Sequence, residues 1–473
     1  MIFTSFEFLL FFLVVILVRN SIRNFNAERW FLLIVSYLFY ASWSVPYVGL
    51  ILFTSTVDWY VARRLGVVEA PHRRKLLLLI SIVLNLGLLG FFKYTNFLLN
   101  NVSFGLHALG LPVQPVHYNI LLPVGISFFT FQSMSYTIDV YRRQIPPCQN
   151  LKDFLLYVAF FPQLVAGPIV RAAALLPQLL RRVRASAEDI EAGLALFAVG
   201  AIKKTVISDQ VSPHVDAIFA NPGGFDALSL MLGAIGYAVQ IYCDFSGYSD
   251  MAIGCARILG YRFPENFQMP YSSVNITEFW RRWHISLSTW LRDYVYIPLG
   301  GNRRGVGRMY WNLMLTMLLG GLWHGASWNF IIWGGLHGGA LALHKLWRDK
   351  MGKPVETSAF ISTIKTSGSH VLTLGLVLVG WVFFRAQTLH EAVQFLSRMF
   401  TFDRTGTHMI SPQILGGTFV VFLAHLMVGK NRNWAEEIAN KSIPERVLAY
   451  SALLFIITCF GATDSAPFIY FQF

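Results

Sequence analysis

The chain has 473 residues, of which 55% are hydrophobic and only 13% charged, and its mean hydropathy is +0.51. A soluble globular domain carries about 25% charged residues, so the composition excludes that class and predicts an all-α polytopic membrane protein. The net charge of +13 does not indicate nucleic-acid binding, because the basic residues lie in short loops and no RNA- or DNA-binding motif accompanies them. The four cysteines have no CxxC spacing, so neither a disulfide framework nor a zinc or other metal site is expected.

Twelve apolar segments, each long enough to cross or half-cross a bilayer, follow one another along the chain. They lie near residues 6–18, 30–43, 45–61, 75–92, 120–141, 190–208, 228–250, 309–325, 327–346, 370–386, 411–428 and 446–462. The first has no basic residue before it and no small-residue cleavage site after it, which indicates a retained helix and not a signal peptide. Residues 1–473 are therefore interpreted as one integral membrane domain.

The distribution of Lys and Arg predicts the orientation of these segments. Basic residues gather in the loops at 19–29, 63–75, 142–143, 181–184, 303–308 and 345–353. Such loops face the cytoplasm, which places the N-terminus and the C-terminal motif at 467–473 on the outer side. Lys203 and Lys204 break the pattern, because they fall near a predicted outer end. Either segment 190–208 does not cross simply, or these two lysines face a polar cavity inside the protein.

Two segments in the middle of the chain contain features unusual for a plain membrane span. Residues 156–170 have Pro162, Gly167 and Pro168 inside an apolar run, which predicts a re-entrant segment buried in protein. The stretch YCDFSGYSD at 242–250 carries Asp244 in a membrane-compatible run. This carboxylate could orient a histidine, hold a substrate hydroxyl or cap a helix, and we favour a role in a cavity.

The stretch EFWRRWHISLSTWLRDYVYIPLGGNRRG at 278–305 has the pattern of an amphipathic helix. At 100° per residue its tryptophans share one face and its arginines lie on the other, which suits the cytoplasmic interface or a shallow cavity. A Pro-Leu-Gly-Gly turn at 298–301 ends it. His284 lies at the edge of the aromatic face, where a histidine is either a hydrogen-bonded structural residue or a functional one.

Seven glycines crowd into residues 320–339, around His324 and His337. Each glycine costs a helix up to about 1 kcal/mol relative to alanine, so their density predicts close helix packing or a broken backbone. A neutral imidazole can be buried at low cost and can still accept a proton, so His324 is either a structural hydrogen-bond donor or a base. On one continuous helix His337 would point about 140° away from His324, so the two need not share a site.

Several of these motifs together resemble a known family. The stretch WHISLSTWLRDYVYIPLGGNRRG and the following LLGGLWHGASWNFIIWGGLHG are similar to the signature of the membrane-bound O-acyltransferases (MBOAT), specifically their bacterial alginate O-acetyltransferase-like branch. The stretches LLPVGISFFTFQSMSYTIDVYR, FFPQLVAGPIVR, YCDFSGYSDMAIG and PFIYFQF extend the resemblance over the whole chain. It implies a multi-pass protein of the bacterial inner membrane, with a ring of about 11–12 transmembrane or re-entrant helices around a central tunnel.

The resemblance also implies which residues form the site. His324 in LWHG would be the catalytic histidine, and His284 in WHISLS the second histidine of the site, with a chemical or a structural role. The residues expected to line the tunnel or the substrate are Trp283, Asp244, Tyr248, Trp323 and Asn329. Tyr470 in FIYFQF is the candidate acyl carrier; the alternative is an aromatic anchor at the outer interface.

The implied reaction is acyl transfer from a cytoplasmic thioester donor, expected to be acetyl-coenzyme A, across the bilayer to a cell-envelope or exported polysaccharide. No bound cofactor is expected, and a periplasmic acetyltransferase is the expected partner. The alternatives are a polysaccharide or lipid transporter and a non-catalytic scaffold of an envelope synthase. Transporters often have two similar halves, and the glycine-rich histidine region has no counterpart in the first half, which counts against a transporter.

Overall fold

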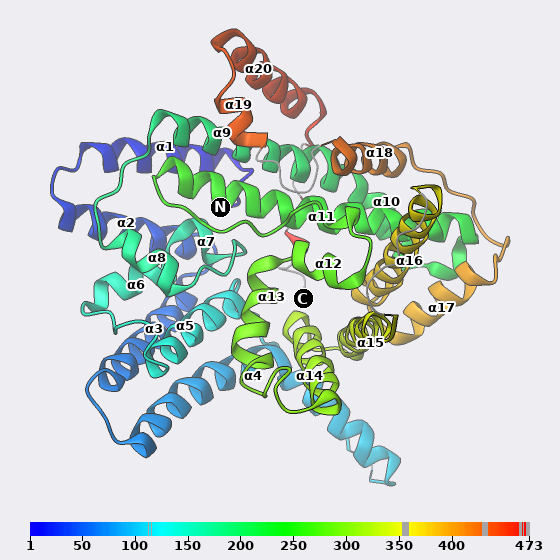
Figure 1. Cartoon of the computed structure of the whole chain (residues 1–473), viewed down its shortest axis with the longest axis horizontal. Helices are drawn as coiled ribbons and strands as arrows, with labels where there is room; N and C mark the ends of the chain where they lie inside the picture. Colours follow the sequence, from blue (N-terminus) through cyan, green and yellow to red (C-terminus); the bar gives the residue numbers. More distant parts are fainter. Residues whose placement is uncertain are drawn as a thin grey trace. The chain divides into compact units, whose positions relative to one another are not determined.

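In the computed structural model, every regular element of the part of the chain that it describes is a helix (Figure 1). The described residues are 1–111, 113–114, 116–351, 359–427, 434–462, 466 and 468–469. Within them, extended backbone pairs only at an isolated bridge between Phe225 and Thr407. The predicted all-α class is confirmed.

Contacts between Cα atoms divide the chain into two compact units. Unit 1 contains Met1–Leu194 and Ala252–Pro264, and unit 2 contains Ala195–Met251 and Glu265–Phe473. The interpretation of residues 1–473 as one membrane domain, and the ring of helices around a tunnel, stay predictions.

Unit 1 is built from the N-terminal helices. These are α1 (Phe6–Ser21), α2 (Phe25–Ala41), α3 (Val45–Leu65), α4 (Pro71–Ala108), α5 (Ile126–Tyr141), α6 (Leu151–Ala159), α7 (Phe161–Leu164), α8 (Ala172–Leu179) and α9 (Ala187–Ala201) as far as Leu194. A buried ion pair joins α1 to α2, with Arg19 Nε donating to Glu28 Oε1 at 2.8 Å. Since a buried charge is costly unless it is paired and hydrogen-bonded, this pair fixes the two helices against each other.

The apolar run at 156–170 is interrupted, as its prolines and glycine predict. Helix α6 ends at Ala159, and α7 extends only over Phe161–Leu164, with Pro162 in its first turn. Most of the run is buried, and Gln163 Nε2 donates to the carbonyl oxygen of Tyr157 at 2.6 Å, next to the break. Irregular backbone is tolerated at membrane depth only where protein satisfies it. The interruption is confirmed, whereas re-entry into the membrane stays a prediction.

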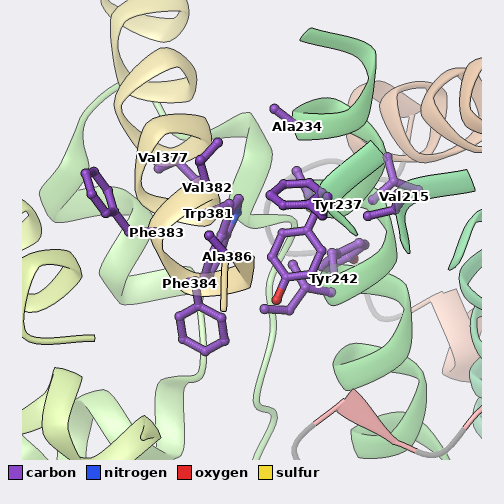
Figure 2. Packing of buried hydrophobic residues seen from close by; sticks show 14 of the residues in the cluster. Val215, Ala234, Tyr237, Tyr242, Val377, Trp381, Val382, Phe383, Phe384 and Ala386 are labelled. Atoms are coloured by element: carbon purple, nitrogen blue, oxygen red, sulfur yellow. The ribbon is translucent and has the colours of Figure 1, made fainter. Parts of the chain in front are cut away.

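Unit 2 contains the remaining helices, in an order that brings two histidine-bearing segments together. They are η1 (Ile202–Ser208), α10 (Asp209–Ala220), η2 (Pro222–Gly224), α11 (Ala227–Ile258), η3 (Pro270–Ser272), α12 (Ile276–Arg282), α13 (Ile285–Leu291), η4 (Arg292–Tyr296), α14 (Val306–His324), α15 (Trp328–Met351), α16 (Ala359–Arg385), α17 (Leu389–Phe400), α18 (Pro412–Met427), α19 (Trp434–Ala439) and α20 (Ile443–Phe460). Of these, η1 is a π-helical turn that continues α9, and α11 belongs to unit 2 as far as Met251. Figure 2 shows its core, where Trp381 and Phe384 of α16 belong to one buried cluster with Tyr237 and Tyr242 of α11.

Each predicted apolar segment overlaps a helix, although the fifth, at 120–141, is helical only from Ile126 onward. Among the described residues, five helices are long and apolar enough to cross a membrane: α3, α4, α11, residues 363–385 of α16, and α20. Helix α20 has no buried residue and α4 has few, so their apolar side chains face outward. Apolar side chains exposed along a whole helix fit a bilayer and not water. The chain is therefore a membrane protein.

The glycines of residues 320–339 serve the packing of α14 against α15. A Cβ atom at Gly321 would overlap the carbonyl oxygen of Phe330, and one at Gly334 would lie 2.5 Å from the carbonyl oxygen of Met317. The two backbones therefore approach so closely that no side chain fits between them. The close packing predicted from glycine density is confirmed, and so is the broken backbone, because α14 ends at His324 and α15 begins at Trp328.

We expect Gly321→Ala to lower the stability of unit 2, because the new methyl group forces α14 away from α15. Overpacking of this kind costs about 1–3 kcal/mol, and backbone atoms cannot yield as a flexible side chain does. Gly307→Ala is the matched control, since nothing lies within 4 Å of a Cβ atom at that position of the same helix. Thermal unfolding of both variants in nanodiscs measures the difference; equal midpoints would contradict the packing argument.

Candidate active site

His324 is the last residue of α14, and the chain turns away directly after it. A Cβ atom at Gly325 would overlap the ring of Phe330, so a larger residue there would displace Phe330 and the start of α15. The imidazole is only 3% exposed. Its ring centre lies 5.1 Å from that of Trp333 on α15 and 5.0 Å from that of Phe384 on α16. Three helices therefore surround His324 with aromatic side chains in a buried position that bulk water does not reach.

The continuous amphipathic helix predicted from residue 278 onward is wrong. Helix α12 ends at Arg282 and α13 begins at Ile285, so that two short helices meet at a bend (Figure 1). His284 lies in this bend with a φ of 43°, in the left-handed region that costs a non-glycine residue about 1–3 kcal/mol. The bend buries the imidazole completely, at 0% exposure. The predicted continuous helix would have placed it at the edge of an aromatic face.

The bend brings the two predicted catalytic histidines together. The ring centres of His284 and His324 are 6.5 Å apart, at an angle of 52°. Trp323 contacts both rings, at 5.8 Å from His284 and 5.0 Å from His324, and Phe245 contacts His284 at 4.6 Å. Burial lowers the pKa of His284 to about 3, so this ring is neutral at physiological pH. One neutral and buried imidazole therefore lies beside a second buried imidazole.

Asn266 holds the bend, and sequence reasoning missed it. Its carbonyl oxygen accepts from Ile285 N at 3.0 Å, and its side-chain oxygen accepts from Ser286 N at 3.2 Å and from Ser286 Oγ at 2.9 Å. Its Nδ2 donates to Ser249 Oγ of α11 at 3.1 Å. The first N–H groups of a helix have no intrahelical partner, so Asn266 satisfies those of α13 from another segment of the chain. It thereby fixes the backbone on which His284 sits.

We expect Asn266→Ala to destabilise the chain more than Ser286→Ala does. The asparagine variant removes the side-chain oxygen shared by the N–H and hydroxyl of Ser286 and the donor to Ser249, at a cost of about 1–3 kcal/mol, and it frees the bend at His284. The serine variant removes only one of these bonds. Thermal unfolding of the two variants is the measurement, and an unchanged midpoint for Asn266→Ala would show that other contacts hold the bend.

Two of the predicted lining residues have clear structural contacts. Trp283 is buried between Trp381 at 4.9 Å and Phe267 at 5.0 Å, measured between ring centres, so it forms part of the core beside the bend. Asn329 donates from Nδ2 to the carbonyl oxygen of Ala386 at 2.8 Å, which ties the start of α15 to the residue after α16. Both residues support the elements that carry the histidines.

Sequence reasoning also missed the aromatic neighbours that the fold supplies. Trp333 lies between His324, at 5.1 Å, and His337, at 4.8 Å, so one indole ring contacts both histidines. His337 is fully buried and also contacts Trp280 of α12 at 5.3 Å. The only sequence signal for Trp333 is its place in the glycine-rich stretch, four residues before His337.

Lys204 and Asp244 form a buried ion pair inside unit 2. Lys204 Nζ lies 2.7 Å from Asp244 Oδ1 on α11 and 2.7 Å from Asp209 Oδ1 at the start of α10. Lys203 pairs separately with Asp250 at 2.7 Å. The sequence left two alternatives for these lysines, and the structure supports the one in which they face a polar environment inside the protein. Both lysines point into the protein, where carboxylates neutralise them, and α9 continues there as a π-helical turn.

The same ion pair holds the C-terminal segment. Lys204 Nζ donates to the carbonyl oxygen of Ala466 at 2.8 Å, and Asp244 Oδ2 accepts from the backbone N–H of Ile469 at 2.8 Å. Phe468 is buried against Tyr248, with ring centres 4.8 Å apart. Asp244 therefore acts on the tail, and Tyr248, predicted to line the site, contacts the tail as well.

The tail also approaches the histidines. The ring of Phe468 lies 5.6 Å from that of Phe245, which in turn lies 4.6 Å from His284. Tyr470, the predicted acyl carrier, lies outside the described residues. It follows Ile469 directly in the sequence, and Ile469 is buried and bonded to Asp244.

Comparisons with known proteins agree with this architecture. The model of the MBOAT family, described as the membrane-bound O-acyltransferase family, matches residues 132–364, a range that includes both histidines. The chain is 40% identical to a probable alginate O-acetylase AlgI of Pseudomonas putida over the full length of both chains. It is 44% identical to the probable alginate O-acetylase AlgI of Pseudomonas aeruginosa, covering 87% of this chain and 76% of the relative. A peptidoglycan O-acetyltransferase of Helicobacter pylori is 35% identical, covering 82% and 76%.

Proposed function

The chain belongs to the membrane-bound O-acyltransferase (MBOAT) family, and from this premise we propose that it transfers an acetyl group from a cytoplasmic thioester to an acceptor hydroxyl, with His324 as the catalytic base. The observation that carries the proposal is the buried pair of His324 and His284, whose ring centres lie 6.5 Å apart beside the C-terminal tail. The family is one of O-acyltransferases, and the names of the relatives agree on transfer to envelope or exported polymers.

The chemistry assigns a role to His324. A hydroxyl with a pKa far above 7 is a weak nucleophile until a positioned base takes its proton. The imidazole of His324 accepts that proton while the hydroxyl oxygen attacks the thioester carbonyl. The new C–O bond forms, the C–S bond breaks, and the leaving thiolate takes the proton back. Burial of the imidazole among Trp333 and Phe384 supports this role, because it keeps water from hydrolysing the thioester.

His284 is assigned a positioning role beside the base. Burial lowers its pKa and favours the neutral ring, which fits a hydrogen-bonding role beside the base. As a neutral ring it can donate or accept one hydrogen bond toward a carbonyl or hydroxyl group held between the two histidines. The bend fixed by Asn266 supports this assignment, because a strained backbone conformation at a site residue persists only where surrounding contacts hold it.

The first acceptor is Tyr470. The tail that precedes it is anchored by Asp244 and Lys204, and Phe468 packs against Phe245, which contacts His284. Acetylation of the tyrosine hydroxyl would give an ester on the protein. A hydroxyl of the outer acceptor would then displace it, form the new ester and restore the phenol. The anchor is consistent with the alternative role of the tail as a simple interfacial attachment, and the variants in the Discussion separate the two.

The donor, the final acceptor and the location complete the proposal. The donor is acetyl-coenzyme A, which reaches the site from the cytoplasm, and the acceptor is a polysaccharide of the cell envelope or an exported polysaccharide. A periplasmic acetyltransferase places the acetyl group on the polymer, and the chain resides in the bacterial inner membrane. The relatives are named as a probable alginate O-acetylase and a peptidoglycan O-acetyltransferase, which supports this class of acceptor.

The test is acetyl transfer by the purified chain in proteoliposomes. Acetyl-labelled acetyl-coenzyme A is supplied on one side, a polysaccharide together with a periplasmic acetyltransferase is supplied on the other, and covalently bound label is counted. The proposal predicts label bound to protein and polymer. A transporter predicts movement of polymer or lipid without bound label, and a scaffold predicts neither; either result would overturn the proposal.

A further inference from the structure

A polar cavity lies in unit 2 between α12 and the C-terminal half of α15. Its volume is about 410 Å³, within the range of about 300–1,000 Å³ found for small-molecule sites. Its wall is formed by α12, the residues that precede it and the C-terminal half of α15. The lining residues that matter here are Asn275, Thr277, Arg281, Arg282, His344 and Arg348.

The cavity carries an excess of positive charge. Glu278 is its one lining carboxylate, and Arg282 Nη2 pairs with it at 3.1 Å. Arg281 and Arg348 pair with no carboxylate among the residues that the structure describes, and both are exposed. Two guanidinium groups therefore face the cavity without a counter-charge from its wall. A planar guanidinium matches phosphate oxygens through two parallel hydrogen bonds, which makes arginine the preferred side chain for phosphate recognition.

Neutral hydrogen-bonding groups extend the same wall. Thr277 Oγ1 and His344 Nδ1 form a hydrogen bond at 2.9 Å, which joins α12 to α15 across the cavity. This bond holds the two arginine-bearing helices at a fixed distance. The arginines are thus presented from two elements whose spacing does not depend on the ligand, which lowers the ordering cost of binding.

The position of the cavity relates it to the histidines. Arg281 and Arg282 lie on α12 directly before Trp283 and His284. Arg348 belongs to the basic stretch at 345–353, which the distribution of charge places on the cytoplasmic side. A ligand that binds its anionic end in the cavity would therefore lie on the side from which a cytoplasmic donor arrives.

We propose that this cavity, with Arg281 and Arg348 as its main contacts, binds phosphate groups, and specifically the phosphate-bearing end of the acyl-thioester donor. The assignment rests on the proposed function for the identity of the donor. The same chemistry would also recognise the phosphate of an anionic lipid headgroup, and the experiment separates these two sources.

The test measures binding of coenzyme A, without acetyl transfer, to the full chain in nanodiscs of uncharged phosphatidylcholine. We expect Arg281→Gln/Arg348→Gln to weaken binding at least about tenfold, since both charge-assisted phosphate contacts are lost. The matched control is Arg73→Gln/Lys75→Gln, which removes two exposed positive charges from the start of α4, also predicted to be cytoplasmic. Unchanged binding by the arginine variant, or equal loss in the control, would overturn the proposal.

Two further arms identify the source of the phosphate. A donor without phosphate, S-acetylpantetheine, should bind the unmodified chain and the arginine variant equally weakly. If the arginine variant lost as much affinity for this donor as for coenzyme A, the phosphate assignment would be overturned. In nanodiscs that contain phosphatidylglycerol, undiminished coenzyme A binding supports the donor as the ligand. If phosphatidylglycerol instead weakens coenzyme A binding, and this effect disappears in the arginine variant, the cavity is assigned to lipid and the donor assignment is overturned.

The outcomes stay separable from those of the proposed function. His324→Ala should bind coenzyme A as the unmodified chain does, because His324 does not line the cavity. Failure of acetyl transfer together with intact arginine-dependent binding would refute the acyltransfer mechanism and retain the phosphate site. Intact transfer with arginine-independent binding would refute the phosphate site and retain the mechanism.

Discussion

His324→Ala is expected to lower acetyl transfer by at least about 100-fold, because general base catalysis by a positioned histidine contributes about 10²–10⁴ in rate. The variant removes the imidazole whose ring centre lies 5.1 Å from Trp333, 5.0 Å from Phe384 and 6.5 Å from His284. The measurement is the initial rate of covalent label transfer in proteoliposomes, normalised to inserted and monodisperse protein.

His425→Gln is the matched control for His324→Ala. His425 is another buried histidine of unit 2, and its Nδ1 is hydrogen-bonded to the carbonyl oxygen of Val421 at 2.8 Å on its own helix. Its substitution disturbs a buried polar group without touching the proposed base, so the rate per folded molecule should stay within a few-fold of normal. Equal rates for the two variants would mean that burial of a histidine, and not its chemistry, explains the effect.

Tyr470→Phe is expected to reduce polymer acetylation to the background rate while the chain still inserts and folds. The substitution removes only the hydroxyl that would carry the acetyl group and keeps an aromatic ring for interfacial anchoring. Tyr450→Phe in α20 is the control, since it removes a hydroxyl from the same C-terminal region. Full polymer acetylation by Tyr470→Phe would reduce the tail to an anchor.

Asp244→Asn tests the position of the tail without changing Tyr470. The amide keeps the shape of the side chain but loses the charge that holds Lys204 and the N–H of Ile469. The transfer rate should fall because the tail is held less often beside Phe245, whereas the tyrosine can still be acetylated. Asp209 retains one carboxylate for Lys204, so the lysine does not remain as an isolated buried charge.

Much of the helical organisation could be predicted from apolar segments and from breaker residues. The prolines and glycine of residues 156–170 predicted the interruption after Ala159, because both residue types act on the local backbone. The glycines near His324 predicted a tight approach of two helices, since few other functions explain such density. These signals are local, so a sequence contains them directly.

The bend at His284 could not be predicted in the same way. The local sequence has helical periodicity throughout, and the left-handed backbone depends on Asn266, which lies in a different segment and supplies hydrogen bonds to α13. Tertiary contacts thus override local periodicity at this residue. Residue spacing alone would have left His284 and His324 unrelated, and only the family resemblance placed them in one site.

The charged residues illustrate an intermediate case. The sequence identified Lys204 as an exception to the distribution of positive charge, but it contained no signal for its partners. Asp209, Asp244 and the carbonyl oxygen of Ala466 come from three separate segments. A buried charge predicts that a partner exists, and only the fold determines which residues provide it.

The most direct test of the central claim is to map the label on the protein after incubation with labelled acetyl-coenzyme A alone, without polymer. The unmodified chain is predicted to carry the label in the peptide that contains Tyr470, and His324→Ala is predicted to carry none. A chain that acetylates added polymer at full rate while no peptide is ever labelled would contradict the account.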